Sequence, residues 1–213
     1  NTIASEVQTP PEDIAILKLL GLLPASYDLD ASMLEVLGDQ VAGYYDPRIK
    51  KLVMISQWMD TGVLTRMLLA HELTHALDDQ YFDLNALTSM EGSADLQLTT
   101  RSLAEGSATV GMMQWVFQGL QKGLISMGEL LKAGNNTGNY DQKSLNKAPA
   151  LLQLELVAPY LSGAHFLMYH HDFSELTKGP APWLGERVLA TVATLPASMA
   201  GPPRQPVAPP GAE

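Results

Sequence analysis

The sequence contains no cysteine among its 213 residues, which excludes disulfide bonds and every site that needs a thiolate. Basic residues are also scarce, because 13 lysines and arginines stand against 23 aspartates and glutamates. The resulting net charge of -10, without any basic cluster, argues against nucleic acid or an anionic membrane surface as a partner. Any metal site must therefore be built from imidazole and carboxylate ligands.

Long hydrophobic runs are missing as well. The longest, residues 14–23, is interrupted by Lys18 and Gly21 and is far shorter than the roughly 20 residues that cross a bilayer, so no transmembrane segment is predicted. At 46% hydrophobic the chain can still bury one good core. We expect a single domain over residues 1–200 and a disordered, proline-rich tail over residues 201–213.

The chain begins with Asn1 rather than methionine, so a natural leader such as a signal peptide would already be absent. We expect an extracytoplasmic location, which means secreted, periplasmic or in the cell envelope. The oligomeric state is not encoded in any pattern of the sequence.

Two helices and a β-hairpin are predicted near the start of the chain. Prolines and acids at residues 10–13 are typical of a helix start, and the apolar spacing predicts a short helix that ends near Pro24. A second helix follows Asp30. Residues 41–46 and 51–56 are rich in β-prone side chains and are joined by a proline-containing turn, which predicts two antiparallel strands.

The rest of the chain is predicted to be mainly helical. A helical stripe over residues 60–80 is followed by a long helix over residues 89–123, whose small residues permit close approach of a neighbour. We expect an exposed loop over residues 133–147 and then a helix over residues 148–171 that bends at its internal proline. A last helix is expected over residues 180–194.

The most informative feature is the pentapeptide HELTH at residues 71–75, within the predicted helix. Residues four apart lie on one face of a helix, so His71 and His75 can bind a single metal ion. Glu72 lies beside them, roughly 100° around the helix axis, where it can hold a metal-bound water. With only five histidines in the chain, a chance match is improbable. The pattern predicts two metal ligands and a general base.

A catalytic zinc site usually has a third protein ligand. The metzincin pattern would need a histidine six residues after His75, but Tyr81 stands there. The remaining candidates are two glutamates on the following helix, Glu91 and Glu105. Fourteen helical residues separate them by about 21 Å along the axis, so only one can bind the same ion.

On these residues the chain resembles the gluzincins, HExxH zinc metallopeptidases of the peptidase MA clan, to which thermolysin also belongs. The resemblance covers residues 21–200 and is strongest to an uncharacterised bacterial branch, in which a strand like residues 41–47 precedes an active-site helix like residues 71–84. The third ligand of that branch lies in a segment like residues 103–109. The resemblance therefore implies Glu105 as the third ligand.

Glu91 remains the alternative ligand, because Glu91 and Asp95 match the thermolysin-like pattern of a glutamate followed by an aspartate four residues later. The longer span from His75 to Glu105 leaves more room for an antiparallel return of the chain and favours Glu105.

Other polar residues have more than one interpretation. Tyr160 is a candidate donor to the oxyanion that forms at the scissile carbonyl, although a tyrosine on an apolar helix also suits packing. Three histidines compete for the same role: His165, His170 and His171. Asp79 and Asp95 are candidates to orient the ligating imidazoles, or to act as solvated or capping residues.

The sequence thus predicts an α+β, zincin-like fold, with a small antiparallel sheet packed on the active-site helix and a mainly helical C-terminal part. The upper part is expected over residues 1–88 and the helical lower part over residues 89–200. The expected activity is hydrolysis of a peptide or protein substrate through a zinc-bound water, with Glu72 as general base. The edge strand near residues 51–56 is expected to bind extended substrate.

Two other functions remain open. The sequence departs from the gluzincin branch near residues 196–198, which keeps a catalytically inactive, zincin-fold binding module as the alternative. The intact Glu72 argues against it. A domain that stays inactive until a propeptide is processed is the third possibility.

Overall fold

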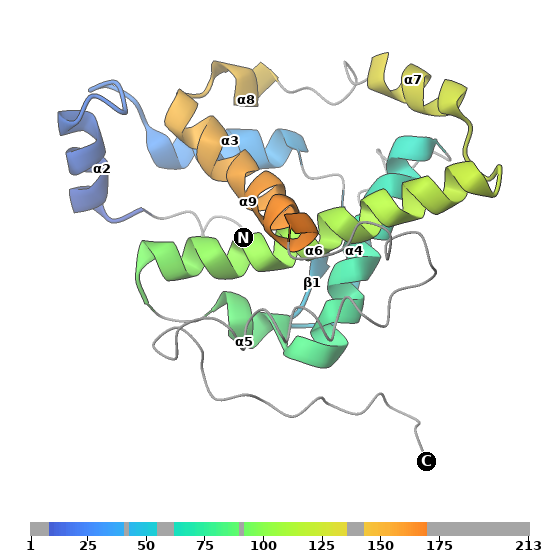
Figure 1. Ribbon diagram of the computed structural model, residues 1–213. Helices are drawn as coiled ribbons and strands as arrows, with labels where there is room; N and C mark the ends of the chain where they lie inside the picture. The colour runs from blue at the N-terminus through green and yellow to red at the C-terminus, as the bar shows by residue number, and fades with distance from the viewer. Residues whose placement is uncertain (1–8, 41–42, 55–61, 90–91, 136–142, 170–213) are drawn as a thin grey trace. The chain divides into compact units, whose positions relative to one another are not determined.

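The computed structural model describes five stretches of the chain: residues 9–40, 43–54, 62–89, 92–135 and 143–169 (Figure 1). This part of the protein consists of helices and one two-stranded sheet, which agrees with the predicted α+β class. Among these residues, no helix is long and apolar enough to span a membrane. The predicted helix over residues 180–194 and the predicted tail lie outside the described residues.

The chain divides into two compact units. The first unit combines residues 1–41 with residues 131–157, and the second combines residues 42–130 with residues 158–213. Helix α9, Ala150–Tyr169, contributes residues to both. The prediction of one domain stays a prediction, and each unit is described by itself.

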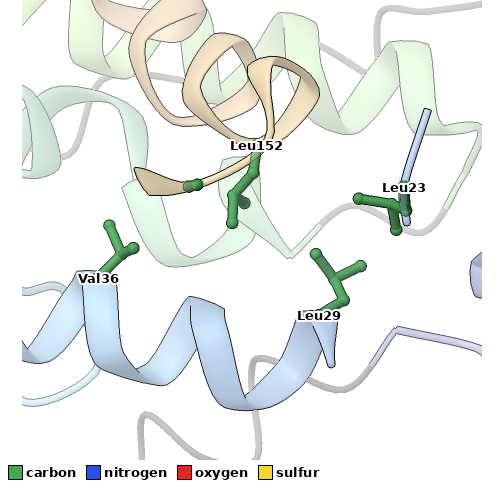
Figure 2. Close-up of a cluster of buried hydrophobic side chains, with 5 residues drawn as sticks. Leu23, Leu29, Val36 and Leu152 are labelled. Carbon is green, nitrogen blue, oxygen red and sulfur yellow. The ribbon is translucent and has the colours of Figure 1, made fainter. Parts of the chain in front are cut away.

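The first unit has a hydrophobic core between α3, Leu29–Gln40, and the beginning of α9. Figure 2 shows Leu29 and Val36 on one face of α3, pointing toward Leu152 of α9. All members of this core are buried: Leu23, Leu29, Val36, Ala148 and Leu152. Full burial of one such aliphatic side chain contributes about 1.5–3 kcal/mol, so this cluster stabilises the unit.

Helix α2, Pro11–Leu19, ends earlier than the predicted boundary near Pro24. Gly21 takes a left-handed conformation with φ 73°. The N–H groups of Gly21 and Leu22 then donate to the carbonyls of Lys18 and Leu17, at 3.1 and 2.9 Å, which is a Schellman motif. The reversal directs Leu23 into the core instead of continuing the helix.

The loop expected over residues 133–147 is helical in part, which corrects the prediction. Helix α7, Met127–Asn135, enters it, and α8, Lys143–Lys147, covers its end. Helix α7 begins at a capping box, in which Ser126 and Glu129 bond each other's backbone N–H at 3.1 and 2.7 Å. Leu145 of α8 packs against the core of the first unit, which stabilises a helical turn that the polar composition did not suggest.

The second unit begins with the predicted hairpin. Strand β1, Gly43–Asp46, pairs with β2, Lys51–Met54, in antiparallel register with Tyr45 opposite Leu52. Both strands contact α4, Val63–Phe82, which carries the HELTH pentapeptide. The prediction of a small antiparallel sheet packed on this helix is therefore confirmed.

The described part of the second unit also contains α5, Leu84–Thr88, α6, Ala94–Gln121, the first residues of α7 and the second half of α9. The short α5 was not predicted. It starts at Asp83, whose left-handed backbone (φ 51°) ends α4 and whose carboxylate accepts from the N–H of Ala86. The helix predicted from residue 89 begins at Ala94, because the Ser93 hydroxyl caps it by accepting from Leu96 N–H at 3.2 Å.

Small residues let α6 approach two neighbours closely, as the sequence suggested. A Cβ on Gly111 would meet Thr74 Oγ1 of α4 at 2.5 Å. A Cβ on Gly106 would overlap the backbone of Gly163 in α9, and one on Gly163 would overlap the carbonyl of Ser102 in α6. The backbones of α6 and α9 are therefore in direct contact at this crossing.

We predict that Gly163→Ala destabilises the protein by about 1–3 kcal/mol, because the added methyl group meets rigid backbone instead of a flexible side chain. Thermal unfolding measures this, with a fall in Tm of roughly 2–4 °C per kcal/mol for a chain of this length. The matched control is Gly38→Ala in α3, where a Cβ meets nothing within 4 Å. That change is expected to stabilise by about 0.5–1 kcal/mol. Equal Tm values for the two variants would contradict the close crossing.

Candidate metal centre

Three predicted ligands come together in the second unit. His71 and His75 project from α4, and Glu105 projects from α6. Each offers one ligand atom, and these atoms all lie within 4.8 Å of one another. Glu105 Oε2 lies 3.1 Å from His71 Nε2 and 3.4 Å from His75 Nε2. The described residues thus contain a largely buried group that can hold a metal ion.

The helices explain why these atoms converge. His71 and His75 are one turn apart on α4, and their rings meet edge to face, with centroids 4.8 Å apart and an interplanar angle of 88°. The contact of Gly111 with Thr74 brings α6 close enough for Glu105, which lies between one and two turns earlier on α6, to contact both imidazoles.

The separation of Glu105 from each imidazole fits a tetrahedral metal site. Ligand atoms about 2.1 Å from a zinc ion, in tetrahedral directions, lie about 3.4 Å apart. The two distances from Glu105 Oε2 to the imidazoles, 3.1 and 3.4 Å, match this value closely. The same distances suit hydrogen bonds in which protons bridge glutamate and histidine. The centre can therefore be held together by protons or by a metal ion, which compete for the same atoms.

Burial and mutual attraction set the protonation of the ligands. Burial opposes the charge of Glu105, but hydrogen bonds with His71 and His75 outweigh it and lower the pKa of Glu105 to about 2. Burial likewise opposes the charge of His75, yet its hydrogen bond with Glu105 raises the pKa of His75 above its ordinary value. Glu105 is therefore a carboxylate at any physiological pH, as a metal ligand must be.

Glu72 lies beside this group without belonging to it. Its side chain is buried, and its Oε2 accepts a hydrogen bond of 2.8 Å from the backbone N–H of Tyr45 in β1. Burial raises the pKa of Glu72, against the attraction of His75 and His71. A carboxylate with a raised pKa is a stronger base at neutral pH, which suits the predicted role.

The strand that faces this carboxylate is β1, because the N–H of Tyr45 points to Glu72 and not to β2. The expectation that the strand near residues 51–56 binds extended substrate stays a prediction, since β2 covers Lys51–Met54 and residues 55–56 lie outside the described residues.

Tyr160 lies next to the centre. Its ring stacks on that of His71, with centroids 5.8 Å apart and an interplanar angle of 28°. Burial and the negative charges of Glu105 and Glu72 raise the pKa of Tyr160, although the residue as a whole remains 41% exposed to solvent. The hydroxyl therefore keeps its proton and is available as a donor. The close contact of α9 with α6 at Gly106 and Gly163 brings Tyr160 next to the candidate metal centre.

The competing residues lie elsewhere or outside the described part. His165 is exposed, and its ring faces Tyr169 at a centroid distance of 6.5 Å. Asp95 is exposed in the first turn of α6. Three candidates lie outside the described residues: Glu91, His170 and His171.

Asp79 has no imidazole among its hydrogen-bond partners in the described residues, and its contacts match the capping role that was left open for it. It accepts from the Tyr45 hydroxyl, Lys50 Nζ and the backbone N–H of Leu84. Asp78 instead lies near His75, and burial raises its pKa to about 6 while the attraction of His75 opposes that rise. Sequence reasoning missed Asp78, although its position three residues after His75 places both on one helix face.

Arg101 was also missed. It lies one turn before Glu105 on α6, is exposed, and lowers the pKa of Tyr160, in opposition to the acidic groups. The spacing of four residues from Glu105 could have indicated it.

Comparisons with protein-family models, with curated proteins and with solved structures find no match to this chain. What the centre does has to be inferred from its own residues.

We predict that the purified protein binds about one zinc ion per chain, and that Glu105→Ala weakens binding by more than the roughly 10- to 100-fold typical of indirect contacts to a metal. His71→Ala and His75→Ala should have the same effect. Competition with a chromophoric chelator measures the affinity. Glu91→Ala is the matched control and should leave binding unchanged. The reverse result for the two glutamates would identify Glu91 as the ligand.

Zinc affinity should fall as the pH is lowered, because a histidine must lose its proton to bind metal. The pKa of His75 is raised in the metal-free protein, so proton competition begins at a higher pH than the ordinary histidine value of about 6.5 implies. Chelator competition over a pH series measures this. Glu105→Gln removes the carboxylate that raises this pKa. In this variant the zinc affinity should be weaker overall, and its decline should begin at a lower pH than in wild type. An unshifted decline would contradict this coupling.

Proposed function

We propose that the protein is a zinc-dependent peptidase of the gluzincin type, with His71, His75 and Glu105 as ligands and Glu72 as general base. The observation that carries the proposal is the convergence of the three ligand atoms from two helices, with a buried carboxylate beside them. The resemblance of the HELTH helix and the Glu105 segment to gluzincins supports the same assignment.

Zinc is proposed because of the donor set. Two imidazoles and one carboxylate, in a chain without thiolates, are typical ligands of catalytic zinc, which keeps a fourth position open. A zinc ion held there supplies Lewis acidity, which lowers the pKa of a water toward ~7 and polarises the peptide carbonyl.

Two side chains of the protein are proposed to transfer the proton and to donate a hydrogen bond. Glu72 takes a proton from the attacking water, whose oxygen forms the new bond to the carbonyl carbon, and passes it to the amine as the C–N bond breaks. The protonated hydroxyl of Tyr160 is suited to donate to the carbonyl oxygen as negative charge develops there.

An extended substrate is proposed to lie along β1. Glu72 occupies the N–H of Tyr45 on the outer edge of this strand, so a peptide that pairs with the other backbone groups of this edge would pass close to the base. Pairing through backbone groups gives affinity with little dependence on sequence. Peptides of about eight or more residues are therefore the appropriate substrates to test.

Glu72→Gln is expected to keep the zinc and the fold but to lower peptide hydrolysis by about 10²–10⁴-fold, because an amide cannot accept the proton. Digestion of a diverse peptide library, followed by mass spectrometry, measures hydrolysis, and elemental analysis measures zinc. If wild type and Glu72→Gln gave the same digests with zinc bound in both, the inactive binding module would be the better interpretation.

A further inference from the structure

Tyr45 is attached to α4 at two points. Its backbone N–H donates to Glu72 Oε2 at 2.8 Å, and its hydroxyl donates to Asp79 Oδ2 at 2.6 Å. Glu72 and Asp79 are seven residues apart, which places them on the same face of the helix, about 10.5 Å apart along its axis. One residue of the hairpin therefore spans two turns of α4, with the candidate base at one end.

Asp79 is the more firmly held of these two attachment points. Its side chain is 1% exposed, and its Oδ2 also accepts from Lys50 Nζ at 2.6 Å. Its Oδ1 accepts from the backbone N–H of Leu84 at 2.9 Å, at the start of α5. A buried carboxylate with three donors, one of them charged, has little freedom to move.

The hairpin is shaped to supply these donors. Lys50 has a left-handed backbone with φ 54°, at the end of the turn that precedes β2. This conformation is uncommon for a side chain other than glycine, and the contact with Asp79 gives a reason for it. Burial and Asp79 raise the pKa of Tyr45, so its hydroxyl remains a donor. Asp79 thus fixes the hairpin through both Tyr45 and Lys50.

We infer that Asp79 is a positioning residue that acts through Tyr45: it fixes β1 against α4, so that the Tyr45 N–H holds one oxygen of Glu72 and leaves the other for water. The terminal torsion of a glutamate has a broad energy profile, so an external hydrogen bond is needed to select one orientation. Misplacement of a reacting group by about 1 Å can cost roughly 10²-fold in rate. The role in catalysis rests on the proposed function, whereas the restraint on Glu72 does not.

The first test is Tyr45→Phe, which removes the hydroxyl and keeps the ring and the backbone N–H. We expect unchanged zinc content, a kcat about tenfold lower and a KM within about twofold, because the restraint on Glu72 is loosened while ligands and substrate edge remain. The matched control is Tyr81→Phe on α4, whose hydroxyl has no hydrogen-bond partner among the described residues and which should match wild type. An unchanged kcat, or a loss of zinc parallel to the loss of activity, would overturn the inference.

The second test separates positioning from a general loss of structure. Because Tyr45 acts through Glu72, Tyr45→Phe should cause no further loss of activity in a Glu72→Gln background. If Tyr45 had a merely structural role, the fold-losses of activity caused by Tyr45→Phe and by Glu72→Gln would multiply in the double variant. The double variant therefore distinguishes a positioning role from simple destabilisation.

Hydrogen exchange gives a readout that does not need activity. The amide of residue 45 should exchange faster in Tyr45→Phe and in Glu72→Ala than in wild type, because the restrained hydrogen bond is weakened in one and removed in the other. Unchanged exchange in Tyr45→Phe would overturn the inference. If wild type hydrolysed no peptide, the proposed function would fail, and the exchange rates would still decide whether this restraint exists.

Discussion

The close approach of α6 to its neighbours is the constraint on which the candidate centre depends. A glutamate side chain reaches only a few ångströms from its backbone, so Glu105 can contact two imidazoles of α4 only if the helix axes lie close together. Gly111 permits this approach at Thr74, and Gly106 permits the corresponding contact with Gly163. These glycines reduce helix propensity by roughly 1 kcal/mol each, which the gain in close packing must offset.

The second constraint is electrostatic, because four carboxylates are buried or nearly so around α4: Glu72, Asp78, Asp79 and Glu105. Each needs a partner or a raised pKa. Asp79 has Lys50 and two neutral donors, and Glu105 has the imidazoles. Asp78 is compensated only in part, because the attraction of His75 opposes burial but burial still raises the pKa of Asp78 to about 6. A divalent cation between the imidazoles would lower the cost of keeping both Glu72 and Glu105 charged.

The sequence predicted those parts of the centre that depend on local periodicity. The spacing of His71 and His75 sufficed because both lie on one helix, and the hairpin was visible from its turn. The sequence favoured Glu105 as the residue that contacts the imidazoles but left Glu91 as an alternative, because this contact depends on where one helix crosses another. The partners of Asp79 could not be read from the sequence, since they come from the hairpin and from α5. A residue adjacent to a motif can thus serve a neighbouring element instead of the metal.

Helical periodicity also explains how α4 can carry both the candidate ligands and the candidate base on separate faces. His71, His75 and Asp78 lie within about 60° of one another around α4, on the face that meets α6. Glu72 and Asp79 are separated by only about 20° from each other, but lie roughly a quarter turn away from the first set, on the face that meets the hairpin. The N–H of Tyr45 therefore reaches Glu72 from a direction that the metal ligands do not use. A glutamate held in this way, adjacent in sequence to a candidate ligand yet turned toward a strand, is suited to the proposed role of proton acceptor.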